Sequence, residues 1–186
     1  MDRYVALLRG INVGGQNLIK MPALKACFEA HGLRDVVTLI QSGNVIFSAT
    51  ASRRVLVREI EQLLAKTFDY PASIVLRTGK QMRDLVAAAP PGFGSEPAKR
   101  RYDVIFLKEP LTAAVAMKSV IARAGVDQAF AGKGVLYFSR LISKASQSQL
   151  SRIISMPIYR SMTIRNWNTT TKILRVMTGP ASAATV

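Results

Sequence analysis

The chain has 186 residues, of which 49% are hydrophobic and 20% charged, and its formal net charge is +15. This composition is typical of a globular protein with one good core or two small ones. The single cysteine excludes an intrachain disulfide framework, and no apolar run approaches the roughly 20 residues of a membrane span. We therefore expect a cytoplasmic protein that does not enter the membrane.

The first half of the chain predicts the order strand, helix, strand, strand, helix, strand. The apolar run Tyr4–Leu8 predicts the first strand, and the helix that opens at Met21 has apolar positions three and four residues apart and ends at Gly32. Ser42-Gly43 predicts a tight hairpin. The hairpin strands, the second helix and the fourth strand are expected at 36–41, 44–48, 53–67 and 72–77. This is the ferredoxin-like order.

The second half repeats this order after a helix at 80–89 and a segment rich in proline and glycine at 90–97, which we interpret as a linker. A last helix is expected to be capped by Asn168 and to lead into a disordered tail. The remaining elements are expected at 102–107, 111–124, 128–131, 135–140, 146–154, 161–165 and 169–177.

The predicted fold class is therefore α+β, with two tandem ferredoxin-like (βαββαβ) subdomains and additional helices. The expected N-terminal subdomain with its linker helix is 1–90, the C-terminal subdomain 91–178 and the tail 179–186.

A glycine-rich loop at 9–17 follows the first strand. Its Gly10 and Gly15 have the spacing of a triphosphate-binding loop, but Gln16 and Asn17 stand where a lysine and a hydroxyl would be needed. The ferredoxin-like order places this loop beside the hairpin. The backbone amides of the loop are then positioned to bind an anionic ligand. The alternative explanation of the glycines is a turn whose backbone needs positive φ and has no ligand. The predicted ligand-binding residues are Arg9, Asn12, Gly14, Gly15, Asn17, Ser42, Gly43 and Asn44.

The second half carries most of the positive charge, and no acidic residue follows Asp127. Such a field attracts polyanions, although a solvated basic surface without a partner is the alternative. The run Val104–Leu107 is apolar on both faces, which favours phosphate contacts over base stacking on an open sheet. The predicted nucleic-acid-binding residues are Lys133, Arg140, Lys144, Arg160 and Arg165, and the end of the second sheet is expected to hold Lys108, Lys133 and Arg160.

The titratable residues predict no catalytic group. Cys27 and His31 lie four apart on the first helix, and we interpret Cys27 as a core residue and His31 as a last-turn residue. One histidine, one cysteine and no acidic cluster at ligand spacing predict neither a metal site nor a cofactor. Asp35, Asp69 and Asp103 are interpreted as solvated loop or strand-end residues.

Three stretches together resemble the domain of unknown function 1697 family: Leu8–Gly15, Met21-x-x-Leu24 and Gln41–Phe47. Arg165-Asn166-Trp167-Asn168-Thr169 resembles the C-terminal motif of that family. The resemblance implies two duplicated ferredoxin-like subdomains, and it implies no reaction.

Two interpretations follow. The first is a monomeric or homodimeric cytoplasmic protein that binds an anionic partner, the phosphates of nucleic acid, through its basic C-terminal half. The second is an enzyme or a binder of an anionic small molecule, with its site at the glycine-rich loop and the Ser42-Gly43-Asn44 hairpin.

Overall fold

The computed structural model describes residues 1–12, 18–41, 43–69 and 71–179, and it has the mixed α+β content that the sequence predicts. The chain divides into two compact units, residues 1–82 with the chain from Lys172 onward, and residues 83–171. The division falls earlier in the chain than the boundary expected at 90/91, and the predicted tail after Gly179 lies outside the described residues. In the described parts of the chain, no helix has the length and apolar character needed to cross a bilayer.

The first unit is built on a four-stranded antiparallel sheet. Its elements are β1 (Asp2–Leu8), α1 (Met21–Ala30), β2 (Arg34–Leu39), β3 (Asn44–Ala49), α2 (Arg53–Phe68), β4 (Ile74–Thr78) and the start of α3 (Gly79–Ala87). The strand order is β2-β3-β1-β4, so β1 pairs with both β3 and β4. Strands β1 and β3, which are distant in sequence, therefore lie side by side in the centre of the sheet.

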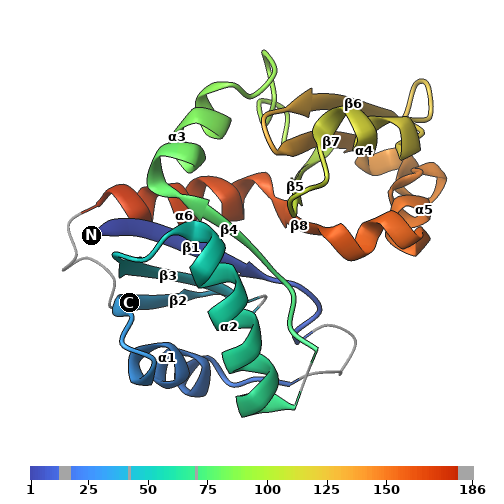
Figure 1. The fold of residues 1–186 in the computed structure, drawn as a ribbon. Coiled ribbons are helices and arrows are strands. Elements are labelled where there is room, and N and C mark those ends of the chain that lie inside the picture. Colours follow the sequence, from blue (N-terminus) through green and yellow to red (C-terminus); the bar gives the residue numbers. More distant parts are fainter. Residues whose placement is uncertain (13–17, 42, 70, 180–186) are drawn as a thin grey trace. The chain divides into compact units, whose positions relative to one another are not determined.

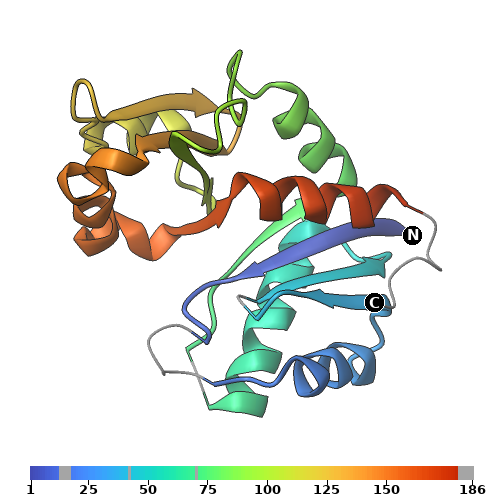
Figure 2. The same ribbon diagram turned by 180° about the vertical axis from the view of Figure 1, so that it is seen from behind.

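Helices α1 and α2 cover one face of this sheet (Figure 1; seen from behind in Figure 2). Phe28 of α1 lies edge-on against Phe47 of β3, with ring centroids 5.6 Å apart, and Ile60 of α2 joins the same core. Apolar residues spaced by three and four along each helix produce this buried stripe. Val5 and Ile46 point to the opposite face and are also fully buried, so the sheet has apolar residues buried on both faces.

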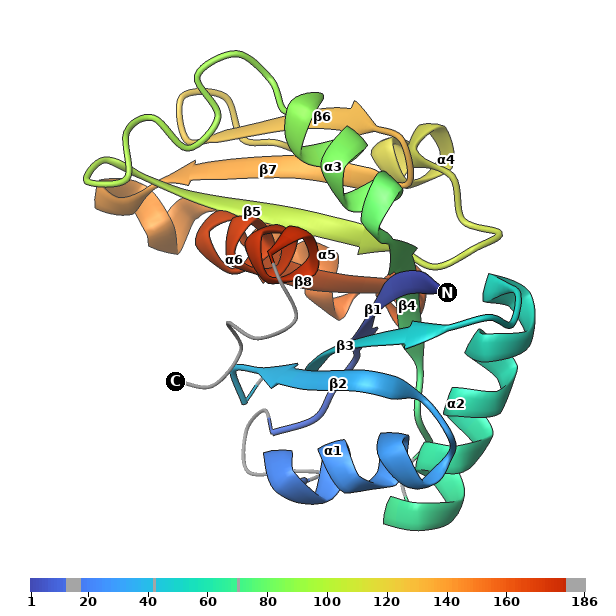
Figure 3. The ribbon, with the colours of Figure 1, turned by 90° about the vertical axis from the view of Figure 1, so that its left-hand side faces the viewer.

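The second unit is built on another four-stranded antiparallel sheet. Its elements are β5 (Arg100–Leu107), α4 (Ala113–Ser119), β6 (Asp127–Gly132), β7 (Val135–Leu141), η1 (Ile142–Gln147), α5 (Leu150–Ser155), η2 (Pro157–Ser161), β8 (Met162–Asn166) and the start of α6 (Trp167–Thr178). The strand order is β6-β7-β5-β8, with β6 at an edge (Figure 3). One face of the sheet packs against α4 and α5 through Ile105, Leu136 and Ile153.

The opposite face of this sheet lies under the segment 90–97, which was predicted to be a linker. Phe93 packs edge-on against Tyr102, Tyr137 and Trp167, with ring centroids 5.0, 5.4 and 5.2 Å apart. Tyr137 is fully buried, and its hydroxyl donates to the carbonyl oxygen of Leu85. The linker interpretation is therefore wrong, because this segment covers the sheet face rather than spanning solvent. The expectation that β5 is buried on both faces is confirmed.

Three helices of the second unit differ clearly from their predicted bounds, and one of them, α5, begins at Leu150 rather than at 146, after the 3-10 segment η1. Helix α4 ends at Ser119 because Val120 is extended, and the carboxylate of Asp127 accepts a hydrogen bond from the Arg123 amide (3.1 Å), which turns the chain toward β6. Helix α6 begins two residues earlier than predicted, and its cap is Asn166 rather than Asn168. The Asn166 side-chain oxygen accepts from the Thr169 amide at 2.7 Å.

Candidate nucleic-acid interface and ligand site

At one end of the first sheet, the loop after β1 meets the turn between β2 and β3. The Leu8 amide donates to the Gly43 carbonyl (2.8 Å), and the Arg9 amide donates to the Ser73 carbonyl (2.9 Å). The side-chain amide of Asn12 donates to the Gln41 carbonyl at 2.8 Å. The two loops that the sequence placed together therefore do meet, as far as the described residues show.

The asparagines at this end hold the loops in place. Asn12 has a φ of 53°, donates a second hydrogen bond to the Ile19 carbonyl (3.0 Å) and accepts one from the Ile19 amide (2.8 Å). Asn44 is fully buried, and its side-chain amide donates to the Leu39 carbonyl at 2.8 Å. Both side chains thus satisfy backbone groups that the turns leave without partners.

Gly43 lies where the two loops are in closest contact. Its φ is 74°, and a β-carbon there would lie 2.5 Å from Ile11 Cδ1 and 2.9 Å from Leu8 Cβ. Arg9 lies beside it and is half-buried. The other predicted members of the ligand site lie outside the described residues: Gly14, Gly15, Asn17 and Ser42.

The second unit repeats the same contacts at the corresponding end of its sheet. The Leu107 amide donates to the Gly134 carbonyl (3.0 Å), and the Lys108 amide donates to the Ser161 carbonyl (2.8 Å). Lys108 therefore occupies the position of Arg9. These bonds bring together the end of β5, the β6–β7 turn and the start of β8, and we call Lys108, Lys133 and Arg160 the basic rim.

The predicted nucleic-acid-binding residues divide into three groups. Lys133 and Arg160 are exposed at the basic rim. Arg140 and Lys144 lie at and beyond the other end of β7, a strand about 20 Å long. Arg140 is also partly engaged, with its guanidinium 3.8 Å from the Asp103 carboxylate.

Arg165 alone forms the third group. Unlike the other four residues it is buried, with only 6% of its surface exposed. Its guanidinium donates to Thr163 Oγ1 and to the Ile164 carbonyl, both at 2.8 Å. Burial lowers the pKa of Arg165 to about 10, so the side chain remains charged at neutral pH. Arg77 is the corresponding residue of the first unit: it is 5% exposed and donates to the Leu76 carbonyl at 2.9 Å.

Asp103 is buried in β5, which corrects its interpretation as a solvated residue. It is 8% exposed, and burial raises its pKa, an effect that the nearby Arg140 and Arg101 oppose. Asp127 is 6% exposed and accepts from the amides of Arg123 and Gln149 at 3.1 and 2.9 Å. Both carboxylates are therefore withdrawn from the surface of the second unit.

The thiol and the imidazole of α1 have separate partners. Cys27 is buried, as predicted, and its Sγ lies 3.6 Å from Thr67 Oγ1, whereas His31 Nε2 lies 3.9 Å from a Glu59 carboxylate oxygen. These contacts give no thiolate–imidazole pair. Within the described ranges, no three histidine, cysteine, aspartate or glutamate side chains gather where they could hold a metal ion.

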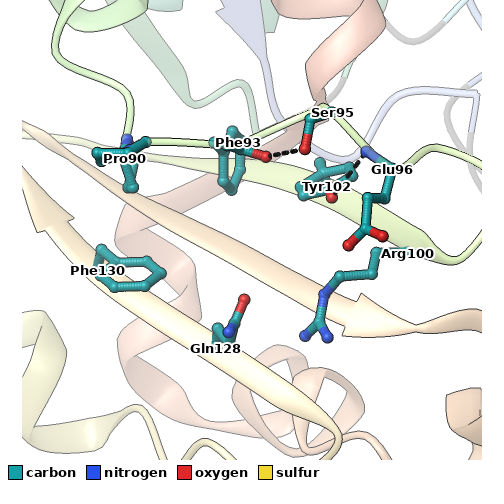
Figure 4. Close-up of a pocket in the computed structure, with 10 residues that line it drawn as sticks. Pro90, Phe93, Ser95, Glu96, Arg100, Tyr102, Gln128 and Phe130 are labelled. Atoms are coloured by element: carbon teal, nitrogen blue, oxygen red, sulfur yellow. Dashed lines mark hydrogen bonds between the residues drawn. The ribbon is translucent and has the colours of Figure 1, made fainter.

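A pocket of about 280 Å³ lies between the segment 90–96 and the second sheet (Figure 4). The sequence alone does not predict this pocket, because the proline and glycine of the segment favour a linker. The available signal was Phe93 with a glycine on either side, an aromatic residue that a solvated linker does not need. The lining includes Pro90, Phe93, Glu96, Arg100, Gln128 and Phe130.

Comparison with known proteins identifies a family and a structural relative. None of the curated proteins matches the chain. A solved structure described as that of the conserved bacterial protein SP0830 from Streptococcus pneumoniae is similar to it, with 27% identity and a TM-score of 0.84, over 95% of this chain and 98% of that chain. The model of the family described as "Protein of unknown function (DUF1697)" matches residues 1–137, so the motif at 165–169 lies beyond the matched segment. On this match over most of its length, the chain belongs to the DUF1697 family of proteins of unknown function.

Proposed function

We propose that the protein binds the phosphates of nucleic acid through the basic rim of its second unit. The observation that carries this proposal is the meeting of Lys108, Lys133 and Arg160 at one end of a sheet, in a chain that has no acidic residue after Asp127. Three cations from three separate segments, the residue after β5, the β6–β7 turn and η2, match a phosphate backbone better than an isolated lysine does.

The electrostatics of the unit support this proposal. Asp103 and Asp127 are buried, so they compensate the surface field only weakly. The exposed cations of the unit are Arg83, Lys99, Arg101, Lys118, Arg123, Lys133, Lys144, Arg152 and Arg160, against the exposed carboxylates of Asp84, Glu96 and Glu109. A surface with such an excess of one sign steers polyanions toward it. Arg165 is left out of the proposed contact set because its guanidinium is buried.

The fold supports a contact made through phosphates. We infer that each unit has ferredoxin-like topology, since each has the order βαββαβ and strand orders β2-β3-β1-β4 and β6-β7-β5-β8. In the second unit both faces of the central strands β5 and β7 are covered, so the centre of the sheet offers no open platform for a row of stacked bases. We further infer a cytoplasmic location, where nucleic acid is available, from the single buried cysteine.

The test is a salt series of fluorescence anisotropy titrations with a labelled single strand and a labelled duplex, from about 50 mM to about 200 mM salt. We expect affinity to fall steeply as salt rises. The double variant Lys133→Ala, Arg160→Ala should reduce the slope of log K against log salt by about 2, since each lost phosphate contact reduces it by about 1.

The matched control is Lys25→Ala, Lys66→Ala, which removes the same charge from the helices of the first unit. Both control residues are exposed, and Lys25 forms an i,i+4 ion pair with Glu29. We expect the control to bind almost as the unchanged protein does. Undetectable binding at low salt, or equal losses in the two double variants, would refute the proposal.

The second candidate function is binding of an anionic small molecule at the corresponding end of the first sheet, by Arg9, Asn12, Gly14, Gly15, Asn17, Ser42, Gly43 and Asn44. The observation that favours it is the turn residue Ile40, which is 49% exposed and has a φ of 58°. A β-branched residue seldom adopts this conformation, and such strain is common at binding sites. A thermal-shift screen of anionic metabolites with Arg9→Ala as control tests it; shifts that persist in the variant count against it.

A further inference from the structure

The pocket beside the edge strand β6 has a shape and a chemistry of its own. Its floor is the face of the second sheet that carries Arg100, Tyr102, Gln128 and Phe130, and its roof is the segment 90–96 (Figure 4). These side chains share one face because residues two apart on a strand point the same way. A volume of about 280 Å³ is close to the lower end of the range for small-ligand sites, which begins at about 300 Å³.

The roof is fixed, so the pocket is preformed. Phe93 anchors it in the aromatic cluster with Tyr102, Tyr137 and Trp167, and a β-carbon at Gly94 would lie 2.5 Å from Trp167 Cδ1. The turn is closed by hydrogen bonds from the Phe93 amide to Pro90 (2.9 Å) and from Ser95 Oγ to Gly92 (2.7 Å). The Glu96 amide donates to the Tyr102 hydroxyl at 3.2 Å. The segment is held above the sheet by these contacts.

The polar side of the pocket is also ordered. Arg100 Nε donates to Ser139 Oγ (3.2 Å), and another guanidinium nitrogen of Arg100 donates to the Val126 carbonyl (3.0 Å). Ser139 Oγ in turn donates to Gln128 Oε1 at 3.1 Å. Because Gln128 Oε1 accepts this bond, the donor end of the amide is its nitrogen. The carboxylate of Glu96 adds an acceptor, and its Oε1 also accepts from Lys99 Nζ at 2.7 Å.

The apolar side consists of Phe130 and Pro90, which lie on the opposite side of the pocket from Arg100 and Glu96 in Figure 4. Phe130 is 43% exposed, which is high for a phenylalanine on a strand. An exposed aromatic face next to hydrogen-bond donors and acceptors suits a flat, neutral ring with polar edges. A free phosphate suits the pocket less well, because Arg100 is already engaged by Ser139 and Val126, and the lining also holds the carboxylate of Glu96, which is paired with Lys99 at 2.7 Å.

We propose that this pocket binds the base of one unpaired nucleotide, with Phe130 against the ring and Gln128 and Glu96 along its edge, while Arg100 orients Gln128 through Ser139. The proposal rests on the proposed function, to which it adds single-strand preference. Phe130 and Lys133 are three residues apart, or about 10 Å along an extended strand, so a base in the pocket places its neighbouring phosphates near the basic rim.

The first experiment uses neutral nucleosides, which carry no phosphate and therefore report on the pocket alone. Binding of guanosine, adenosine, cytidine and uridine is followed by NMR with the full chain and with Phe130→Ala and Gln128→Ala. We expect Phe130→Ala to weaken binding about tenfold, as loss of a stacking partner does. The control is Ile154→Ala on α5, which removes an equally exposed apolar side chain (45%) and should change nothing.

The second experiment compares a single strand with an abasic strand of equal length. We expect Phe130→Ala to weaken binding of the normal strand and to leave the abasic strand unaffected. If the variant binds strands and nucleosides as the unchanged protein does, the pocket proposal is overturned while the basic rim stands. If nucleosides bind and neither strand does, the rim proposal fails and the pocket remains. Binding of a proline-rich peptide in place of nucleosides would also overturn the base assignment.

Discussion

Gly43 shows how a single residue specifies the contact between two loops. Replacement by alanine puts a β-carbon 2.5 Å from Ile11 Cδ1, in a backbone with a φ of 74°. We expect Gly43→Ala to lower the free energy of unfolding by about 3 kcal/mol, the sum of left-handed strain and overpacking. Urea unfolding followed by circular dichroism measures this change.

Gly32→Ala is the matched control for this substitution. Gly32 has a similar φ of 83°, but a β-carbon there has no heavy atom within 4 Å. We expect a loss of about 1 kcal/mol, from backbone strain alone. Equal losses at the two glycines would mean that the packing of Gly43 against Leu8 and Ile11 contributes nothing to stability.

The buried carboxylate of Asp103 leads us to expect that the stability of the protein depends on pH. Burial raises its pKa above the ordinary 3.8, so the folded protein holds this proton more tightly than the unfolded chain does. This contribution to stability is therefore present at low pH and is lost as the pH rises through the folded pKa. We expect Asp103→Asn to be more stable than the unchanged protein by about 1 kcal/mol at pH 7, with no difference near pH 3.

The measurement is thermal or urea unfolding of both proteins across this pH range. Arg140 and Arg101 are the charges that oppose the rise in the pKa of Asp103. A variant less stable than the unchanged protein at pH 7 would show that the contact between Asp103 and Arg140 outweighs the cost of burial. That result would reverse the expected sign.

At the scale of elements, the N-terminus of α6 distinguishes two neighbouring asparagines. Asn166 accepts from the Thr169 amide at 2.7 Å, whereas Asn168, which the sequence suggested as the cap, lies within the helix. We expect Asn166→Ala to lower the free energy of unfolding by about 1 kcal/mol and Asn168→Ala to change it by less than about 0.5 kcal/mol. Denaturant unfolding of the two variants is the measurement. A larger loss of stability in Asn168→Ala than in Asn166→Ala would identify Asn168 as the cap.

The segment 90–97 shows why local composition misled the assignment of an element. Proline and glycine correctly predicted turns, and turns are found. The error was to infer that a turn-rich segment is solvated. Phe93 decides its position, because its ring is accommodated by Tyr102, Tyr137 and Trp167, which come from three different elements of the second unit.

At the scale of the whole molecule, the net charge of +15 predicts an effect of salt on stability. Like charges repel across the compact state, and the Debye length falls from about 30 Å at 0.01 M to about 10 Å at 0.1 M salt. We expect the melting temperature to rise by several degrees when sodium chloride is added over this range, as scanning calorimetry measures. A melting temperature that falls would show that attractive ion pairs outweigh the repulsion.

The repeated unit is also a property of the whole chain. The Leu8–Gly43 and Arg9–Ser73 bonds of the first unit recur as Leu107–Gly134 and Lys108–Ser161 in the second. The sequence predicted this duplication from the order of elements, since hydrophobic periodicity is a local property that each half displays. It also predicted the meeting of the two loops, because strand order determines which loop ends are neighbours.

The sequence by itself determined the succession of strands and helices, the burial of residues such as Val104 and Cys27, and the positive charge of the second half. Only the tertiary structure decided which polar groups face solvent: Lys133 and Arg160 do, while Arg165 and Asp103 do not. It alone also placed Phe93 over the sheet and formed the pocket beside Phe130. The physical reason is that the spacing of apolar residues is a local property of the sequence. The burial of a charged or turn residue depends instead on which distant side chains pack against it.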